Sequence, residues 1–320
     1  MLRYYLRLIS LFSIVFMLAI GCNYYNHYQT EDVADSGDCR LVEHSMGRVC
    51  IPQNPQRMIA LNPAALGNAI ALGLKPIASV FEYDGQPPNH LAGKTNGIES
   101  LGEWAQPNIE RMALLKPEVM IGWRHNHEAI YPHLAAIAPT LFYDWIGGNV
   151  SKDNWKHYFD FMAEALNRQE ARDQVWQHYY QRVERLKVAL GDRYRDKPIS
   201  FIFFCCGGIL TEASFSGSVL KDVGLLRPSS QLDDFGPNSV LSEETLDRAD
   251  GYAIFVGIYG GRETGEEDFQ VLQNKPLWQK LKAVQQNRVY FVDPTAWRGR
   301  TPLAANAILD DLEKYLLNTP

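Results

Sequence analysis

The chain has 320 residues, of which 46% are hydrophobic and 21% charged, and its formal net charge is −6. A chain of this length and apolar content can bury the cores of two domains of ordinary size. The acidic balance is the opposite of the basic surface that binds nucleic acid or an anionic membrane patch. Composition therefore predicts a globular protein and argues against nucleic acid as a partner.

Residues 1–21 have the pattern of a secretory signal. Arg3 and Arg7 precede an apolar run, 8–20, that is too short to span a bilayer. The next residues, LAIGC, resemble the lipobox of bacterial lipoproteins, although Ala19 stands where leucine is commonest. The resemblance implies that Cys22 is acylated and anchors the protein in the cell envelope, on the periplasmic or extracytoplasmic face. An uncleaved anchor and an ordinary signal peptide are the alternatives.

Residues 22–38 are polar and lack periodicity, which predicts a flexible tether. Beyond it, Cys39 and Cys50 flank a predicted hairpin, and an exported protein can form a disulfide between them. Cys205 and Cys206 are adjacent in the predicted strand FIFFCCGG. Neighbouring cysteines rarely bridge without strain, so we expect two buried free thiols, with a redox pair as the alternative.

Strand and helix patterns alternate from residue 58 onwards. The expected elements are a strand at 58–61, a helix from Pro63 to near Gly73 with Asn62 as its N-cap, and a strand at 76–81. A surface passage rich in Gly, Pro and Asn follows at 82–106, and then come a strand at 119–121, a helix at 128–137 and a strand at 140–142. This alternation of strands and helices predicts a parallel sheet covered by helices, in a first lobe of residues 39–166.

Residues 151–190 contain neither proline nor glycine, and we expect helix throughout with a break near Asn167. The second piece forms a long connecting helix in a segment of residues 167–191. A second lobe, 192–320, follows with a strand at 199–204 and helices near 216–223 and 266–281. A strand at 289–293 and a terminal helix from Pro302 complete it. The predicted fold class is α/β, with two doubly wound lobes joined by one long helix.

Two segments, 107–126 and 242–262, repeat one pattern. Each has a short amphipathic helix with a glutamate (Glu110, Glu244) and then a buried strand that ends in glycine. An aromatic residue and an arginine lie just beyond each strand. Because ligands of open α/β sheets bind beyond the carboxyl ends of the strands, the repeat predicts a ligand held between the lobes.

Several segments in order carry a family resemblance: VCIPQNPQRMIALNPAALGNAIALGLKPIA, QPNIERMALLKPEVMIG, YPHLAAIAPTLF, FSGSVLKDVGLLRP and RVYFVDPTAWRGRTPLAANAILDDLEKYL. Together they resemble the substrate-binding proteins of bacterial ABC importers for ferric siderophores and cobalamin, over residues 39–318. The resemblance implies two lobes around a shallow cleft, with Glu110 and Glu244 docking on a dimeric permease. It favours the siderophore branch, with cobalamin or haem as alternative ligands. Either glutamate could instead complement its helix dipole.

A ferric siderophore is an often anionic chelate with apolar flanks, so its site needs cations and aromatic surface but no iron ligands from the protein. Arginine suits its oxygens through bidentate hydrogen bonds, although any single arginine could be a solvated loop charge. The expected ligand-binding residues are Trp104, Arg124, His125, Trp145, Tyr259, Arg262, Trp297, Arg298 and Arg300. Trp123 could belong to the site or to the core.

A secreted hydrolase or metalloenzyme and a scaffold lipoprotein are the rival classes. The segment HEAIY fails the zincin pattern, because Tyr131 stands where a second histidine is needed. No histidine follows His178, and the chain has no G-x-S-x-G motif. We therefore expect a monomer that is not an enzyme and has neither a cofactor nor a metal site of its own.

Overall fold

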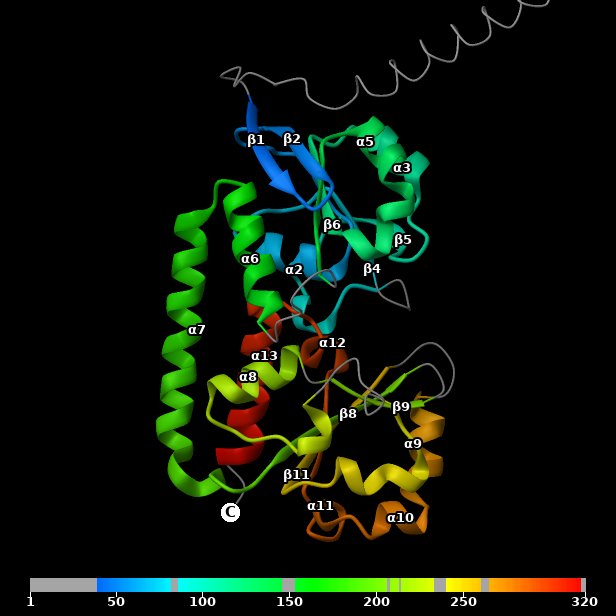
Figure 1. The fold of residues 1–320 in the computed structure, drawn as a ribbon, viewed down its shortest axis with the longest axis vertical. Coiled ribbons are helices and arrows are strands. Elements are labelled where there is room, and N and C mark those ends of the chain that lie inside the picture. Colours follow the sequence, from blue (N-terminus) through cyan, green and yellow to red (C-terminus); the bar gives the residue numbers. More distant parts are fainter. Residues whose placement is uncertain are drawn as a thin grey trace, which may run out of the picture.

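The computed structural model describes residues 39–81, 86–145, 153–205, 208–212, 214–232, 240–259 and 265–317. Within these ranges the chain forms two α/β lobes stacked along the long axis of the molecule (Figure 1). The predicted signal, the tether and Cys22 lie outside the described residues. None of the helices described is both long and apolar enough to cross a membrane.

A two-stranded hairpin precedes the first sheet. Strands β1 (Cys39–His44) and β2 (Gly47–Pro52) are antiparallel. A disulfide joins Cys39 to Cys50, whose Cα atoms are 5.6 Å apart. Ser45 at the turn donates its backbone N–H to the carbonyl of Phe142 over 2.9 Å, which fixes the hairpin to the first lobe.

The first lobe is built on five parallel strands in the order β5-β4-β3-β6-β7. They are β3 (Met58–Ala60), β4 (Ala78–Phe81), β5 (Glu99–Glu103), β6 (Val119–Trp123) and β7 (Thr140–Tyr143). One face packs on α2 (Pro63–Ala71), and the other packs on α3 (Ile109–Leu115) and α5 (Tyr131–Ile137). Short turns are η1 (Asn89–Leu91), α4 (Arg124–His127) and η2 (Glu128–Ile130). Both faces of the sheet are covered, as the sequence predicts.

Local chemistry explains the start of α2. The Asn62 side chain accepts a hydrogen bond from the N–H of Ala65 at 2.7 Å, and Pro63 holds the first helical position. Strand β5, by contrast, lies inside the passage that the sequence suggested was irregular. Only Leu101 of its five residues is buried, so the strand carries almost no apolar signal.

The second lobe has a mixed sheet in the order β10-β9-β8-β11-β12. Strands β8 (Ile199–Cys205), β11 (Ala253–Ile258) and β12 (Val289–Val292) are parallel, whereas β9 (Gly208–Thr211) and β10 (Val240–Leu241) pair antiparallel. The hairpin from β8 to β9 was not predicted. Around the sheet lie α8 (Phe215–Asp222), α9 (Gly265–Gln273), α10 (Pro276–Gln279), α11 (Lys282–Gln285), α12 (Pro294–Trp297) and α13 (Pro302–Leu312). The 3-10 helices are η3 (Gly191–Tyr194), η4 (Ser229–Gln231) and η5 (Glu243–Ala249), and η6 (Glu313–Leu317) is a π-helix.

The two repeated segments therefore differ in their helices. In the first, α3 is an α-helix, whereas in the second, η5 is a 3-10 helix kinked at Thr245. The expectation of two equivalent amphipathic helices is wrong for the second segment. Both segments nevertheless lead into a buried parallel strand, β6 and β11.

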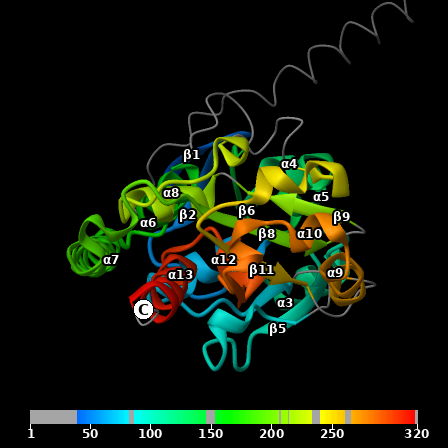
Figure 2. The ribbon, with the colours of Figure 1, turned by 90° about the horizontal axis from the view of Figure 1, so that it is seen from below.

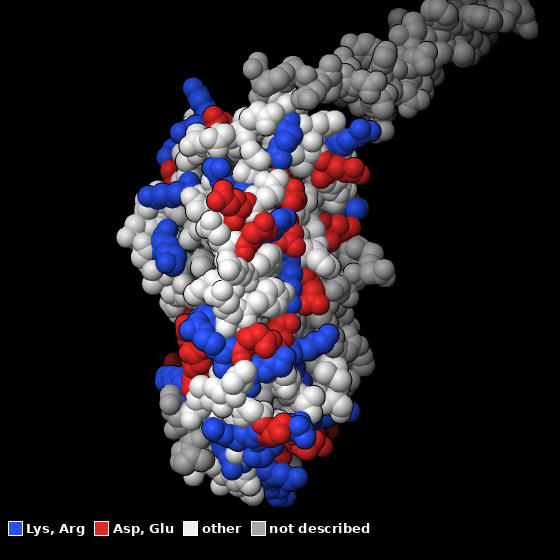
Figure 3. Space-filling view, turned by 90° about the vertical axis from the view of Figure 1, so that its left-hand side faces the viewer, with Lys and Arg blue, Asp and Glu red and all other residues white. Residues whose placement is uncertain are grey.

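The connector consists of α6 (Asn154–Ala165) and α7 (Gln169–Leu190), with the chain turning at Asn167, whose φ is 55°. Ion pairs from Arg172 to Glu164 and from Arg182 to Asp310 tie α7 to its neighbours at 2.6 Å each. The face of the molecule that carries α7 mixes acidic and basic side chains (Figure 3). Among the described residues of this face, charges of both signs therefore lie side by side.

The lobes are joined by more than the long helix. One continuous apolar core contains Leu66 of the first lobe, Leu186 of α7, and Phe255 and Ile308 of the second. Helix α13 runs alongside the second lobe, its upper end reaches the first, and it contacts α2, α7 and α8 (Figures 1 and 2). The shared core fixes how the two sheets face one another.

Gly67 of α2 and Thr301, the N-cap of α13, approach each other closely in this joint. A Cβ placed on Gly67 would lie 2.8 Å from Cγ2 of Thr301. The Thr301 hydroxyl is engaged, because it accepts the N–H of Ala304 at 3.1 Å. The side chain therefore cannot turn away without losing the cap.

Replacing Gly67 by alanine should lower the free energy of unfolding by about 1–3 kcal/mol, because the added methyl forces the two helices apart. Urea denaturation would measure the loss. The matched control is Gly208→Ala, since a Cβ on Gly208 meets no atom within 4 Å. Equal stability of the two variants would show that the joint between the lobes is loose.

Candidate functional site

The candidate site lies where the carboxyl edges of the two sheets face each other. From the first lobe, β6 ends at Trp123 and runs into Arg124 and His125. From the second lobe, Tyr259 directly follows β11, and the turn after α12 carries Arg298 and Arg300. This is the edge at which open α/β sheets bind their ligands.

Aromatic side chains form the wall of the first lobe. The ring of Trp123 lies 5.6 Å from His125, stacked, and 5.1 Å from Trp145. Trp145 is 6% exposed, and Tyr158 supports Trp123 from the core at 6.1 Å. Trp123, which the sequence left open, is therefore the centre of this wall.

The charged groups of this wall partly cancel. Arg124 pairs with Glu128 at 2.9 Å and Asp144 at 3.6 Å, and the Glu128 hydrogen bond raises the pKa of the guanidinium. His125 is exposed at the surface, yet the protein around its ring desolvates it enough to lower its pKa. The charges of His127 and Arg300 lower that pKa further. At neutral pH the wall is thus aromatic, with a neutral imidazole.

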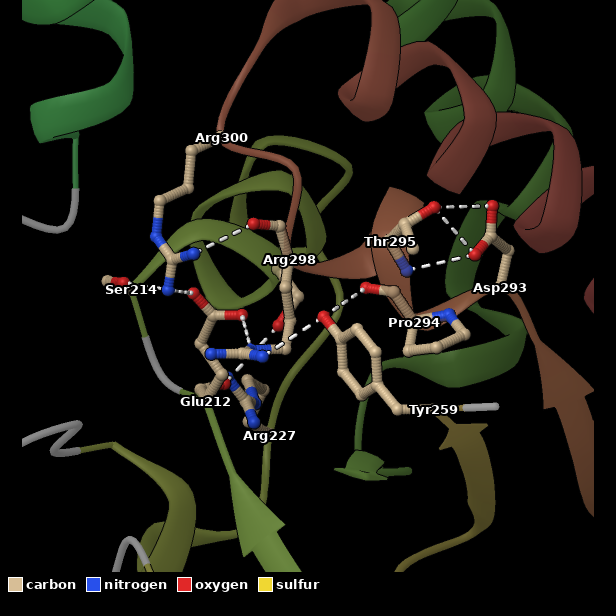
Figure 4. A network of polar contacts seen from close by, with 10 residues as sticks. Glu212, Ser214, Arg227, Tyr259, Asp293, Pro294, Thr295, Arg298 and Arg300 are labelled. Atoms are coloured by element: carbon tan, nitrogen blue, oxygen red, sulfur yellow. Dashed lines mark hydrogen bonds and ion pairs between the residues drawn. The ribbon is translucent and has the colours of Figure 1, made fainter. Parts of the chain in front are cut away.

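Arginines form the wall of the second lobe around one buried carboxylate (Figure 4). The side chain of Glu212 is 5% exposed and pairs with Arg300 at 2.7 Å and Arg298 at 3.7 Å. Arg298 donates to the hydroxyl of Tyr259 at 3.0 Å and stacks over Phe203 at 4.2 Å. The structure thus brings Arg298, Arg300 and Tyr259 together, and their role in ligand binding stays a prediction.

The sequence did not point to Glu212, which follows the unpredicted strand β9. It also did not point to Arg227, which donates to the backbone carbonyl of Glu212 and, at 2.8 Å, to Gln231. Arg227 lies in the segment GLLRP that carries the family resemblance, and this was the only available signal for it.

One contact joins the two walls. The guanidinium of Arg300 lies 5.7 Å from the centre of the Trp145 ring. The charge of Arg300 also acts on His125. The residues expected from the two lobes therefore face one another across a short distance.

Trp297 is not part of the site, so its expected role in ligand binding is wrong. Its side chain is fully buried, lies 4.6 Å from Phe255 and 4.9 Å from Phe201, and donates its indole N–H to Asp311 at 2.8 Å. The single turn of α12 directs Trp297 inward, and the next residue, Arg298, emerges beside Tyr259. The sequence alone could not show which of these two neighbouring side chains faces the core and which faces the site.

Three further expectations have different outcomes. Trp104 packs against the cluster that includes Met112, on the α3 side of the sheet, whereas Trp123 and Trp145 belong to the core cluster on the other side. Arg262 and Cys206 lie outside the described residues.

Cys205 is disulfide-bonded, so the expectation of a free thiol there is wrong. Among the residues described, no three histidine, cysteine or acidic side chains are grouped to hold a metal ion.

His90 lies under the arginine turn, in the contact between the lobes. It belongs to η1, which packs on α12 and α13, and a Cβ on Gly299 would approach its Cε1 to 3.1 Å. Burial lowers the pKa of His90 to about 4, although Asp293 opposes the shift. The neutral imidazole is therefore part of the joint.

The fold defines a class of protein with two α/β lobes, whose aromatic and cationic walls face each other at the carboxyl edges of the sheets. Comparison with known families gives the same class. A model of the family described as "Periplasmic binding protein" matches residues 58–296, and the chain belongs to this family.

Relatives and solved structures resemble the whole chain. The probable siderophore-binding lipoprotein YfiY of Bacillus subtilis is 31% identical, covering 99% of this chain and all of that protein. The achromobactin-binding periplasmic protein of Dickeya dadantii is 29% identical and covers 86% of this chain and 92% of that protein. Staphylococcus aureus SirA, complexed with staphyloferrin B, superposes with a TM-score of 0.74 at 22% identity, covering 87% of this chain and 98% of SirA. At that identity, the SirA match shows a shared fold.

Stability should fall as the pH drops from about 6.5 to about 4. The unfolded chain binds a proton on His90 near its ordinary pKa, whereas the folded protein takes it up only near pH 4. The stabilising contribution is thus complete above pH 6.5 and is lost toward pH 4. Replacing His90 by glutamine should reduce the loss between pH 7 and pH 4.5 by about 2 kcal/mol.

Urea denaturation at both pH values would measure this difference. His133→Gln is the matched control, because His133 is exposed on α5. An unchanged pH dependence in His90→Gln would show that His90 is not held neutral in the joint.

Proposed function

We propose that the chain is an extracytoplasmic solute-binding lipoprotein that captures a ferric siderophore between its lobes and delivers it to an ABC importer for iron uptake. The observation that carries the proposal is the arginine pair Arg298 and Arg300 facing the wall of Trp123 and Trp145. The relatives support the class of ligand, since their names record siderophores or ferric citrate.

The chemistry of such a chelate fits the two walls. The chelator fills the coordination sphere of iron, so the protein has to recognise the outside of the complex. Guanidinium groups bind its carboxylate, catecholate or hydroxamate oxygens, and indole rings cover its apolar flanks. On this proposal Arg298, Arg300 and Tyr259 hold the anionic side, while Trp123, Trp145 and His125 hold the flat side.

Delivery requires a membrane and a permease. Acylation of Cys22 would tether the monomer to the membrane, and the tether of residues 22–38 would let it reach the transporter. Glu110 on α3 and Glu244 on η5 are both exposed, one on each lobe. Each would pair with cations of one half of a dimeric permease.

Cobalamin is the second candidate ligand. A vitamin B12-binding protein of Yersinia pestis is 28% identical over 46% of this chain. Haem would need an axial ligand such as Tyr259 or His125, but the Tyr259 hydroxyl already accepts a hydrogen bond from Arg298. A titration that includes both compounds beside ferric siderophores distinguishes these ligands.

The mature protein, residues 22–320, should bind one class of ferric chelate with submicromolar affinity, and its iron-free form should not bind at such concentrations. Tryptophan fluorescence is the measurement, because Trp123 and Trp145 lie in the proposed wall. The panel contains ferric citrate, ferri-bacillibactin, ferrichrome, haem and cobalamin. Replacing Arg298 and Arg300 by glutamine should weaken binding more than tenfold.

That pair of substitutions alone would leave the buried Glu212 without its cations, which destabilises a protein by several kcal/mol. The variant to use therefore also carries Glu212→Gln, and Arg185→Gln on the exposed face of α7 is the control. Undiminished affinity in a folded triple variant would refute this placement of the site.

Replacing Glu110 or Glu244 by glutamine should leave ligand affinity unchanged and reduce uptake of the chelate by cells at least severalfold. The reason is that each exposed carboxylate would lose its pairing with the permease and takes no part in the ligand walls. Glu184→Gln, on the outer face of α7, controls for the change in charge. Loss of ligand binding in either variant would contradict the docking role.

A further inference from the structure

Glu212 is the most deeply buried acidic side chain in the site, and it lies among arginines. Arg300 and Arg298 reach its carboxylate at 2.7 and 3.7 Å, and the Ser214 hydroxyl lies 3.4 Å from Oε1. Arg227 binds the backbone carbonyl of the same residue. Two guanidinium groups therefore meet the carboxylate of Glu212, and a third binds its backbone (Figure 4).

Holding the arginines in place does not by itself require an acid. Arg298 is also held by the Tyr259 hydroxyl and by the ring of Phe203, and Arg300 also donates to the carbonyl of Arg298 at 2.8 Å. Moving a carboxylate out of water costs several kcal/mol before its partners compensate. A neutral side chain at this position could also hydrogen-bond to the arginines, but it would carry no negative charge.

That charge acts on the wall that would meet an anion. In the first lobe, Glu128 and Asp144 already neutralise Arg124, and the lowered pKa of His125 keeps its imidazole neutral. The excess positive charge of the described site residues therefore lies in the second lobe. There, the carboxylate of Glu212 offsets part of the positive charge of Arg298 and Arg300, the two guanidinium groups that reach it.

We propose that Glu212 is an internal counter-ion that sets how much negative charge the site accepts from its ligand. It is a positioning residue in the sense that it acts through Arg298 and Arg300 rather than by touching the chelate. The inference rests on the proposed function and adds to it a determinant of ligand charge.

The test compares two ferric chelates of different charge. Ferri-bacillibactin is trianionic, because three catecholates each lose two protons, whereas ferrichrome is uncharged, because three hydroxamates each lose one. Glu212→Gln should shift the ratio of the two affinities at least tenfold toward ferri-bacillibactin. The shift should shrink as salt screens the charges. Glu212→Asp, which keeps the charge, should retain the ratio of the wild type.

Glu184→Gln controls for the loss of one negative charge elsewhere. If Glu212→Gln weakens both chelates by the same factor, Glu212 only holds the arginines and the inference is overturned. An unchanged ratio overturns it as well. Should Glu212→Gln fail to fold, Arg300→Gln removes a positive charge from the same wall and must shift the ratio toward ferrichrome.

A second measurement separates this inference from the proposed function. Free citrate is an anion without iron, and its stabilisation of the protein against heat reports the charge of the arginine wall alone. A larger citrate effect in Glu212→Gln than in Glu184→Gln supports the counter-ion even when no ferric chelate binds the wild type. Chelate binding without that citrate difference would leave the transport function standing and overturn the role of Glu212.

Discussion

Helix α13 packs against α2 of one lobe and α7 of the connector, and the position of every group in the site depends on this packing. The joint is close enough that Gly67 has no room for a Cβ beside Thr301. The turn that precedes α13 carries Arg298 and Arg300, so the helix that joins the lobes also places the arginine wall. Apolar burial at about 25 cal/mol per Å² makes separation of such an interface costly.

On this scaffold, ion pairs and hydrogen bonds hold the side chains of the arginine wall in place. Arginines at the end of a chain segment would be mobile in water, but Glu212 and Tyr259 hold two of them in fixed directions. The Trp123 and Trp145 rings are fixed by packing on Tyr158 and on each other. Both walls are therefore ordered before a ligand arrives, which reduces the entropy lost on binding.

The sequence predicted the parts of this structure that carry strong local signals. Pro63 after Asn62, the break at Asn167 and the apolar run of β8 all match the structure. Strand β5 was missed because only Leu101 is buried. Trp297 was misplaced because it and Arg298, adjacent at the end of α12, point in different directions, one into the core and one toward Tyr259. Glu212 could not be found from the sequence, since its importance comes from arginines that are 86 and 88 residues away.

A joint of this kind also limits how the protein can discriminate between ligands. A hinged receptor can select by closing only on a ligand of the right shape, but lobes that share one core have little such freedom. Selection then has to come from the walls themselves, through the shape of the aromatic surface and the charge of the arginine surface. In the first lobe the positive charge of Arg124 is already neutralised by Glu128 and Asp144. The balance between Glu212 and its arginines is therefore where a change of one residue would alter which chelates are bound.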